Sequence, residues 1–326
     1  MIKTWTLKTR TVRFDRTVLM GILNVTPDSF SDGGRFAKAS SRFDVDLDAL
    51  ADAARKLVRD GAGILDVGGE STRPGSAPVD EAEELRRVAP AIAALKRAVD
   101  VPISVDTYRA AVADAALEAG AEIVNDVAAG RYISSQKRFA AEDEEGFPEE
   151  IAEVARRRGA AVVLMHMRGT PQTMQDGTPE YPNGVTNEVC AFLARRRDRF
   201  LDAGVPLERI AFDPGLGVGK FGKTFEQNWE LLRNVDKLRE LGGITLVGDS
   251  RKRFLAETAR RFNSARKAEP DADVDPDARQ TRDFATAATT VALARKGVQI
   301  VRVHNVAISA FALELARRSG ELWAEK

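Results

Sequence analysis

Short apolar runs and longer segments of helical period alternate along almost the whole chain. The apolar runs that we interpret as strands lie at residues 18–24, 64–67, 103–106, 122–125, 161–165, 210–213, 244–248 and 299–303. The helical candidates that follow them lie at residues 45–59, 80–98, 109–119, 149–158, 186–203, 225–241, 284–296 and 307–318. This alternation predicts an α/β fold in which helices join parallel strands. Eight units favour a closed (β/α)₈ TIM barrel. On spacing alone, an open sheet of six to eight strands is about as well supported as the barrel.

Three segments depart from this rhythm. Residues 1–16 alternate weakly around Thr9 and Arg10, which predicts an N-terminal β-hairpin. Residues 131–146 and 260–279 are polar and rich in acids, and we interpret both as solvated insertions with too little apolar surface to fold alone. The whole chain, residues 1–326, is therefore predicted to be a single barrel domain.

Polar side chains gather where the predicted strands end. In chain order they are Asn24, the group Glu70 to Arg73, Asp106, Asn125 with Asp126, Met165 with His166, Asp213, Lys252, and Arg302 with His304. The carboxyl ends of barrel strands form one rim, and active sites lie there. Each residue also has a local interpretation: Asp106 or Asn125 could cap the next helix, and a lone histidine is more often a core residue. The recurrence of polar residues at almost every strand end favours a functional rim.

The residue types divide this rim into two sets. Asp106, Asn125, Asp213 and Lys252 match the donor–acceptor edge of a flat heterocycle such as a guanine-like or pterin ring, because a carboxylate accepts two parallel N–H bonds. Asn24, Arg302 and His304 form a second set of donors, which we place at the opposite side of the rim. Arginine is the usual bidentate ligand of phosphate. The rim therefore predicts a ring pocket beside an anion pocket.

Composition narrows the class of protein. Lys plus Arg and Asp plus Glu both number 49, so the formal net charge is zero, which argues against a nucleic-acid partner. The one cysteine, Cys190, allows neither an intramolecular disulfide nor a cysteine-based zinc cluster, which predicts a cytoplasmic protein. Two histidines cannot build a three-His metal site. No stretch has the uncharged length that crosses a bilayer, so no membrane partner is expected.

Several strings in the chain are specific enough to identify a family. They are residues 20–34 (MGILNVTPDSFSDGG), 66–75 (DVGGESTRPG), 104–107 (SVDT), 124–127 (VNDV), 164–171 (LMHMRGTP), 212–215 (FDPG), 250–252 (SRK) and 302–304 (RVH). In this order the strings resemble the motifs of the dihydropteroate synthase family, a group of pterin-binding TIM barrels. The family joins para-aminobenzoate to 6-hydroxymethyl-7,8-dihydropterin diphosphate and releases diphosphate, a step of folate biosynthesis.

The resemblance implies roles for individual residues. The pterin would be held by Asp106, Asn125, Met165, Asp213 and Lys252, with Phe221 covering it. The diphosphate would be held by Asn24, Arg302 and His304, with Mg²⁺ near Asn24. The aminobenzoate pocket would be completed by Phe30, Asp32, Thr72, Arg73, Pro74 and Arg253, the first five on two mobile rim loops. The catalytic residues would be Asp32, Arg73, Asp106, Lys252 and Arg302.

The family's reaction implies a dissociative substitution. Diphosphate would leave first, and the pterin methylene would become a cation that the amine then attacks. Arg302, His304 and magnesium would stabilise the leaving group. The resemblance also implies a homodimer and inhibition by sulfonamides, which mimic aminobenzoate.

Three positions depart from the family pattern. Arg253 stands where the family usually has serine, about three residues are inserted after Gly217 (most naturally residues 218–220), and Asn305 replaces the usual aspartate. Arg253 and the insertion predict reduced sulfonamide affinity, unless Arg253 points to solvent. Asn305 is expected to have a modest effect. Two other functions stay open: a non-catalytic pterin-binding homologue, and a pterin-barrel methyltransferase acting on a methylated folate.

Overall fold

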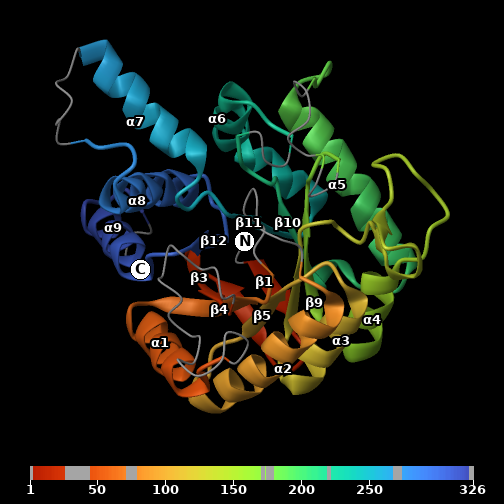
Figure 1. Cartoon of the computed structure of the whole chain (residues 1–326). Coiled ribbons are helices and arrows are strands. Elements are labelled where there is room, and N and C mark those ends of the chain that lie inside the picture. Colours follow the sequence, from red (N-terminus) through yellow and green to blue (C-terminus); the bar gives the residue numbers. More distant parts are fainter. Residues whose placement is uncertain are drawn as a thin grey trace.

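The computed structural model describes residues 3–25, 45–70, 79–169, 173, 180–218, 222–266 and 274–322 (Figure 1). Eight parallel strands close into a barrel in chain order, and helices surround it. The strands are β3 (Val18–Asn24), β4 (Ala62–Gly68), β5 (Ile103–Asp106), β6 (Ile123–Asp126), β9 (Ala161–Met165), β10 (Ile210–Asp213), β11 (Ile244–Val247) and β12 (Ile300–Val303). The predicted (β/α)₈ barrel is confirmed, and the open-sheet alternative is wrong because β3 pairs with both β12 and β4.

Most of the predicted helices are present. They are α1 (Leu47–Arg59), α2 (Glu81–Ala98), α3 (Ala110–Ala119), α4 (Glu150–Arg158), α5 (Val185–Asp202), α6 (Phe225–Arg233), α8 (Arg279–Arg295) and α9 (Val306–Arg318). Side chains fix several of their starts: Asp46 accepts from the Ala49 N–H at 3.0 Å, and Asp80 accepts from the Glu83 N–H at 2.7 Å. The helix expected over residues 225–241 ends at Arg233 and continues as the 3₁₀ helix η3 (Val235–Leu241).

The interpretation of residues 260–279 as an insertion is wrong at both ends. An extra helix, α7 (Arg253–Arg266), runs into this segment, and α8 begins at Arg279 rather than at residue 284. The first part of α7 is apolar: Phe254, Leu255 and Ala256 are buried, and the Phe254 ring packs edge-on against Trp229 of α6. Its outer half presents charged side chains, which is why the apolar pattern did not reveal it. In Figure 1, α7 extends away from the barrel above α8.

The N-terminal hairpin is confirmed and closes the barrel end opposite the functional rim. Strands β1 (Lys3–Thr6) and β2 (Thr11–Phe14) pair antiparallel. Trp5, Leu7 and Phe14 are buried in one apolar cluster with side chains of the barrel interior such as Met20 and Ile64. In Figure 1 the N-terminus lies over the middle of the barrel.

The segment at residues 131–146 is not a purely solvated insertion. It contains a small hairpin of β7 (Tyr132–Ile133) and β8 (Arg138–Phe139), joined by the 3₁₀ helix η1 (Ser134–Gln136). Ile133 is fully buried, and Tyr132 and Phe139 pack against a buried cluster at the rim. The prediction that this segment has too little apolar surface to fold is therefore wrong for residues 132–139, because the contacts that order it come from distant parts of the chain.

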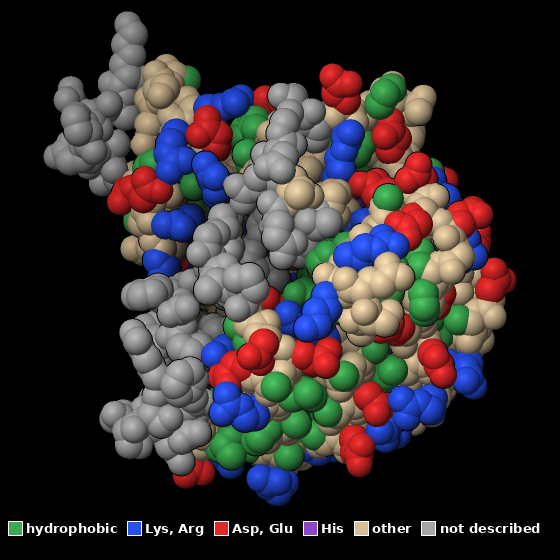
Figure 2. All heavy atoms as spheres, turned by 45° about the vertical axis from the view of Figure 1, so that its right-hand side comes forward, with side chains coloured by type: hydrophobic (Ala, Val, Ile, Leu, Met, Phe, Trp, Pro, Cys, Tyr) green, Lys and Arg blue, Asp and Glu red, His purple; other side chains and the backbone are tan. Residues whose placement is uncertain are grey.

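The surface is mixed in charge. Figure 2 shows acidic and basic side chains interspersed over the face that α2, α3, α4 and α5 cover. Among the residues that the structure describes, no helix is long and apolar enough to cross a membrane.

Candidate active site

Arg302 lies at the centre of the rim. It extends from β12 across the barrel mouth, where Nε donates to Asp66 Oδ2 at 2.6 Å and Nη2 donates to Asp106 Oδ2 at 2.8 Å. The guanidinium therefore links β12 to β4 and β5. The prediction that Arg302 lies opposite the ring set is wrong: it pairs directly with Asp106, a member of that set.

Asp66 is a site residue that sequence reasoning missed. Its side chain is fully buried, and Oδ2 accepts from both Arg302 and Asn125 Nδ2, the latter at 3.1 Å. Its Oδ1 atom has no hydrogen-bond partner among the described residues. A buried carboxylate is costly unless it is paired, so Asp66 and Arg302 must be considered together. The available signal was a single acid in the otherwise apolar run 62–68.

Neither Asp106 nor Asn125 caps a helix. The residue before α3 is Arg109, which makes no side-chain cap, and the turn after β6 is held by Asp126, which accepts from the Ala128 N–H at 2.8 Å. Asp106 and Asn125 instead turn toward Arg302 and Asp66. The structure therefore favours the functional interpretation of both residues over the capping one.

Asp213 and Lys252 complete the ring set. Asp213 ends β10 and is buried, and its Oδ1 accepts from the Gly215 N–H at 2.7 Å. Burial raises the pKa of Asp213, and the nearby cation of Lys252 opposes that rise. Burial also lowers the pKa of Lys252 to about 8, against the pull of Asp213. Two neighbouring groups of opposite charge whose pKa values are both shifted are typical of a pocket prepared for a polar ligand.

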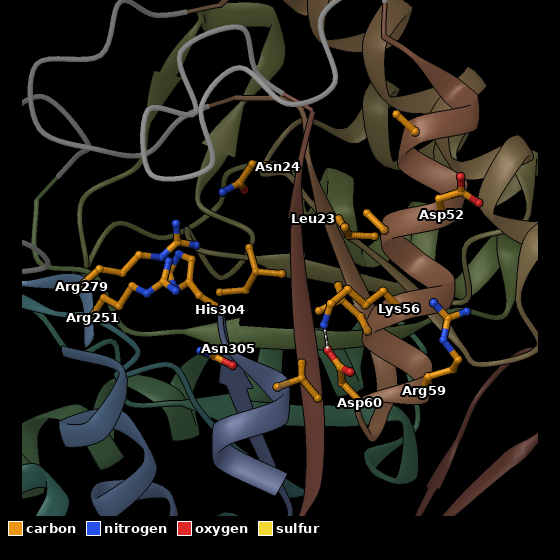
Figure 3. A pocket seen from close by; sticks show the side chains of 15 residues that line it. Leu23, Asn24, Asp52, Lys56, Arg59, Asp60, Arg251, Arg279, His304 and Asn305 are labelled. Carbon is orange, nitrogen blue, oxygen red and sulfur yellow. Dashed lines mark hydrogen bonds and ion pairs between the residues drawn. The ribbon is translucent and has the colours of Figure 1, made fainter. Parts of the chain in front are cut away.

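Two members of the anion set, Asn24 and His304, line a cavity of about 530 Å³ between β3, α1 and the start of α9, whereas Arg302 is not among its lining residues. Asn24 ends β3, and His304 follows β12, where its Nδ1 lies 3.0 Å from Ser250 Oγ. Figure 3 shows Arg251, Arg279 and His304 turned toward the same space below Asn24. Two arginines that the sequence reasoning did not assign thus join the predicted anion pocket.

The structure explains why asparagine rather than aspartate stands at position 305. Asn305 Nδ2 donates to Asp283 Oδ2 at 2.9 Å, and the same carboxylate receives two bonds from Arg251, at 2.6 and 3.0 Å. Its Oδ1 also accepts from the Ile308 N–H and so caps α9. An aspartate at this position would face the Asp283 carboxylate, whereas the amide donates to it.

A second lysine lies close to Asp213 and Lys252. Lys223 is fully buried, and its Nζ lies 2.9 Å from Nδ1 of His166. Burial lowers the pKa of His166 well below its ordinary value and that of Lys223 to about 7. His166 and Lys223 thus form a buried pair directly after the end of β9. Sequence reasoning missed Lys223.

The remaining predicted residues divide into two groups. Met165 ends β9 and is buried in the apolar cluster that contains Tyr108 and Met167. Arg253 is the first residue of α7, and its side chain is exposed, which favours the alternative in which it points to solvent. Several predicted residues lie outside the described part of the chain: Phe30, Asp32, Thr72, Arg73, Pro74 and Phe221. Residues 219–220 of the predicted insertion lie outside it as well.

The oxygen atoms near Asn24 fit the donor set that magnesium prefers. Gly68 lies next to both residues: a methyl group built on it would make ordinary contacts of 3.4 Å with Asn24 Oδ1 and 3.8 Å with Asp106 Oδ2. Mg²⁺ is usually held by one or two protein oxygens together with substrate phosphates and water. No group of three acidic, histidine or cysteine side chains forms a metal site within the described residues. The residues therefore suit a cation that a diphosphate brings with it.

Together the fold and the rim define a class: a (β/α)₈-barrel enzyme whose rim holds acids around Arg302, close to a cavity that basic side chains line. The family model for pterin binding enzymes matches residues 20–304. The dihydropteroate synthase of Synechocystis sp. is 40% identical over 308 residues, which are 94% of this chain and 91% of that protein. The chain thus belongs to the pterin-binding enzymes and, within them, to the dihydropteroate synthase family.

Solved structures agree with this assignment. The Yersinia pestis dihydropteroate synthase in a sulfonamide drug complex superposes with a TM-score of 0.78 and 34% identity, covering 97% of this chain and 99% of that one. The Xanthomonas albilineans enzyme in complex with 7,8-dihydropteroate gives a TM-score of 0.74 and 32% identity, covering 98% and 100% of the two chains.

Proposed function

We propose that this chain synthesises 7,8-dihydropteroate from 6-hydroxymethyl-7,8-dihydropterin diphosphate and para-aminobenzoate. The observation that carries the proposal is Arg302, which binds the carboxylates of Asp66 and Asp106 and lies two residues before His304, which lines a cavity together with Asn24. One cation thus connects a pocket of acids to a pocket of anion ligands. A substrate that has a heterocycle at one end and a diphosphate at the other fits this arrangement.

The ring end of the substrate would lie among Asp106, Asn125, Asp213 and Lys252, over Met165. The two carboxylates accept from the amino and ring N–H groups of the pterin, and the ammonium donates to its carbonyl or ring nitrogen. Because Asp213 is held by the Gly215 N–H, its carboxylate is already oriented before the ligand arrives. This preorganised negative charge also stabilises the cation that forms at the pterin methylene.

The leaving group would be stabilised at the other end. Arg302 and His304 would donate to diphosphate oxygens, and Asn24 would hold a magnesium ion, which would supply positive charge to the leaving group. In a dissociative substitution the C–O bond to diphosphate breaks first, so the bond electrons pass to the oxygen that these residues face. The amine of aminobenzoate then forms the C–N bond and loses a proton. The amine is a weak nucleophile, so its positioning contributes much of the rate.

Two alternative functions predict different outcomes for one experiment. The purified chain is incubated with both substrates and Mg²⁺, and the product is identified by mass. We expect 7,8-dihydropteroate. Tight pterin binding with no product would instead favour a non-catalytic homologue. In a parallel incubation that contains a methylated folate, transfer of its methyl group would favour a methyltransferase.

Arg253 is expected to lower sulfonamide affinity. It replaces the usual serine of the family and begins α7 directly after Lys252. Arg253→Ser should therefore lower the sulfonamide inhibition constant about threefold to tenfold, which corresponds to about 0.7–1.4 kcal/mol. Inhibition of both proteins is measured at matched aminobenzoate concentrations. An unchanged constant would mean that the exposed Arg253 side chain only packs its aliphatic stem.

We also propose a homodimer that forms through α8 and α9. Phe284 on α8 is 71% exposed, and Phe311 and Leu315 on α9 are 64% and 52% exposed. Ile308, Phe311 and Leu315 follow helical spacing, so they share one face of α9. Such a patch is unusual on a monomer. Light scattering should give twice the chain mass, and Phe311→Glu should shift it toward one chain mass. A monomeric parent protein would contradict the proposal.

A cytoplasmic location completes the proposal. It rests on the single cysteine, Cys190, and on the folate chemistry of the family.

A further inference from the structure

The hairpin at residues 131–140, hereafter the insertion hairpin, is anchored firmly to the rim. Arg131 is almost fully buried and donates to three carbonyl groups: Ala140 at 2.9 Å, Met167 at 2.7 Å and Gly169 at 3.1 Å. The first of these lies in the insertion, and the other two follow β9. A buried guanidinium that satisfies carbonyls from two segments joins those segments rigidly. The insertion hairpin is thus an integral part of the rim.

Three aromatic rings connect the insertion hairpin to the start of α3. Tyr132 and Phe139 come from the hairpin, and Tyr108 comes from the turn after β5. The ring centroids are 4.9 Å apart for Tyr108 and Tyr132, 5.1 Å for Tyr108 and Phe139, and 5.0 Å for Tyr132 and Phe139. Tilted and edge-on pairs at this spacing are attractive beyond the area that they bury. This ring cluster fixes the position of the Tyr108 side chain.

Tyr108 and its neighbour Arg109 hold Glu70. The Tyr108 hydroxyl donates to Glu70 Oε2 at 3.0 Å, and Arg109 Nη1 donates to the same oxygen at 3.0 Å. Arg109 also lies over the Tyr108 ring, with 4.8 Å from Cζ to the ring centroid, and pairs with the buried Glu84. Burial raises the pKa of Tyr108, which keeps its hydroxyl protonated as a donor. The Glu70 carboxylate is therefore fixed from two sides.

Val79 is held by the same residues. Its N–H donates to Glu70 Oε1 at 3.3 Å, and its carbonyl accepts from Arg109 Nη2 at 2.8 Å. Glu70 and Val79 are the described residues on either side of residues 71–78. Glu70, Tyr108, Arg109 and Val79 therefore form a clasp that sets the distance and direction between the two ends of that segment.

We propose that the insertion hairpin acts as a brace for aminobenzoate binding: through the ring cluster it positions Tyr108 and Arg109, and these hold Glu70 and Val79. The proposal rests on the proposed function, in which Thr72, Arg73 and Pro74 serve the aminobenzoate pocket. Tyr108, Arg109, Tyr132 and Phe139 are positioning residues, since they act through the clasp. The brace gives the insertion a role that its acidic sequence did not suggest.

Steady-state kinetics test the brace through the two substrates separately. Tyr108→Phe removes only the hydroxyl that binds Glu70, and it should raise the KM for aminobenzoate about fivefold while the KM for the pterin diphosphate stays within about twofold. Tyr132→Leu combined with Phe139→Leu should act in the same direction. Tyr132→Phe keeps the ring and should behave as the parent protein. Glu144→Gln is the matched control, because it changes only the exposed contacts of Glu144 with Arg138 and with the Ala141 N–H in the same insertion and leaves the ring cluster untouched.

Hydrogen exchange gives a readout that does not need activity. The Val79 N–H should exchange faster in Tyr108→Phe and in the double leucine variant. Its exchange rate should be unchanged in Glu144→Gln. If the hairpin acts through Tyr108, combining all three substitutions should cost less than the sum of their separate effects. Equal rises in both KM values, or an unchanged aminobenzoate KM with faster Val79 exchange, would overturn the proposal. A parent protein that forms no dihydropteroate would instead overturn the proposed function, and Val79 exchange would still report whether the hairpin holds the clasp.

Discussion

Replacing Arg302 by methionine is expected to lower kcat about 100-fold or more and to destabilise the fold. The activity falls because a cation that faces the leaving diphosphate is lost, and removal of one such donor typically costs a factor of 10² to 10³. The stability falls because Asp66, which is fully buried, loses the guanidinium that binds it at 2.6 Å. Breaking a buried pair from one side costs about 3–5 kcal/mol.

A second substitution separates these two effects. Asp66→Asn in the Arg302→Met background removes the unpaired carboxylate, so it should recover part of the unfolding free energy without recovering activity. Denaturant unfolding and steady-state kinetics measure the two quantities on the same samples. An Arg302→Met protein that keeps its stability within about 1 kcal/mol would contradict the central position assigned to this pair.

Replacing Lys252 by methionine is expected to lower kcat/KM for the pterin diphosphate about 100-fold. The ammonium faces Asp213 in the ring pocket, and methionine keeps the length of the side chain but removes the charge and the donor. Because burial lowers the pKa of Lys252 to about 8, the parent protein should lose activity as pH rises through about 8. Lys252→Arg should lack this alkaline fall, since arginine keeps its proton.

The stability of the protein should respond to pH in the opposite direction. Between about pH 8 and the ordinary lysine value of 10.5, the unfolded chain binds the proton that folded Lys252 has released. Stability rises with pH wherever the unfolded state binds more protons, so the contribution of Lys252 to folding improves over this range. Lys223, with a pKa of about 7, adds in the same direction. An alkaline fall in activity that follows unfolding would therefore contradict the assignment to Lys252.

The barrel could be predicted from the sequence because its strands are buried on both faces and appear as isolated apolar runs. Four of the eight strands, among them β3 and β9, have the predicted bounds. Helix α7 could not be found this way, because its outer half has no apolar stripe. The fold of the insertion hairpin also escaped prediction, because Tyr132 and Phe139 pack on Tyr108, which precedes them by 24 and 31 residues.

The rim shows the same division between local and long-range information. The polar residues at the strand ends were visible, since a parallel barrel brings such ends together. The way Arg302 extends to Asp66 and Asp106 was not visible, because side-chain direction across a barrel mouth has no local signal. Asp66 was overlooked inside an apolar strand, and Lys223 inside a glycine-rich loop.

The coupling of the two pockets is tested most directly by measuring diphosphate release with each substrate omitted in turn. The proposed function predicts steady release only when the pterin diphosphate and aminobenzoate are both present, with one dihydropteroate formed for each diphosphate. Release that is independent of aminobenzoate, or no release although the pterin binds, would contradict it.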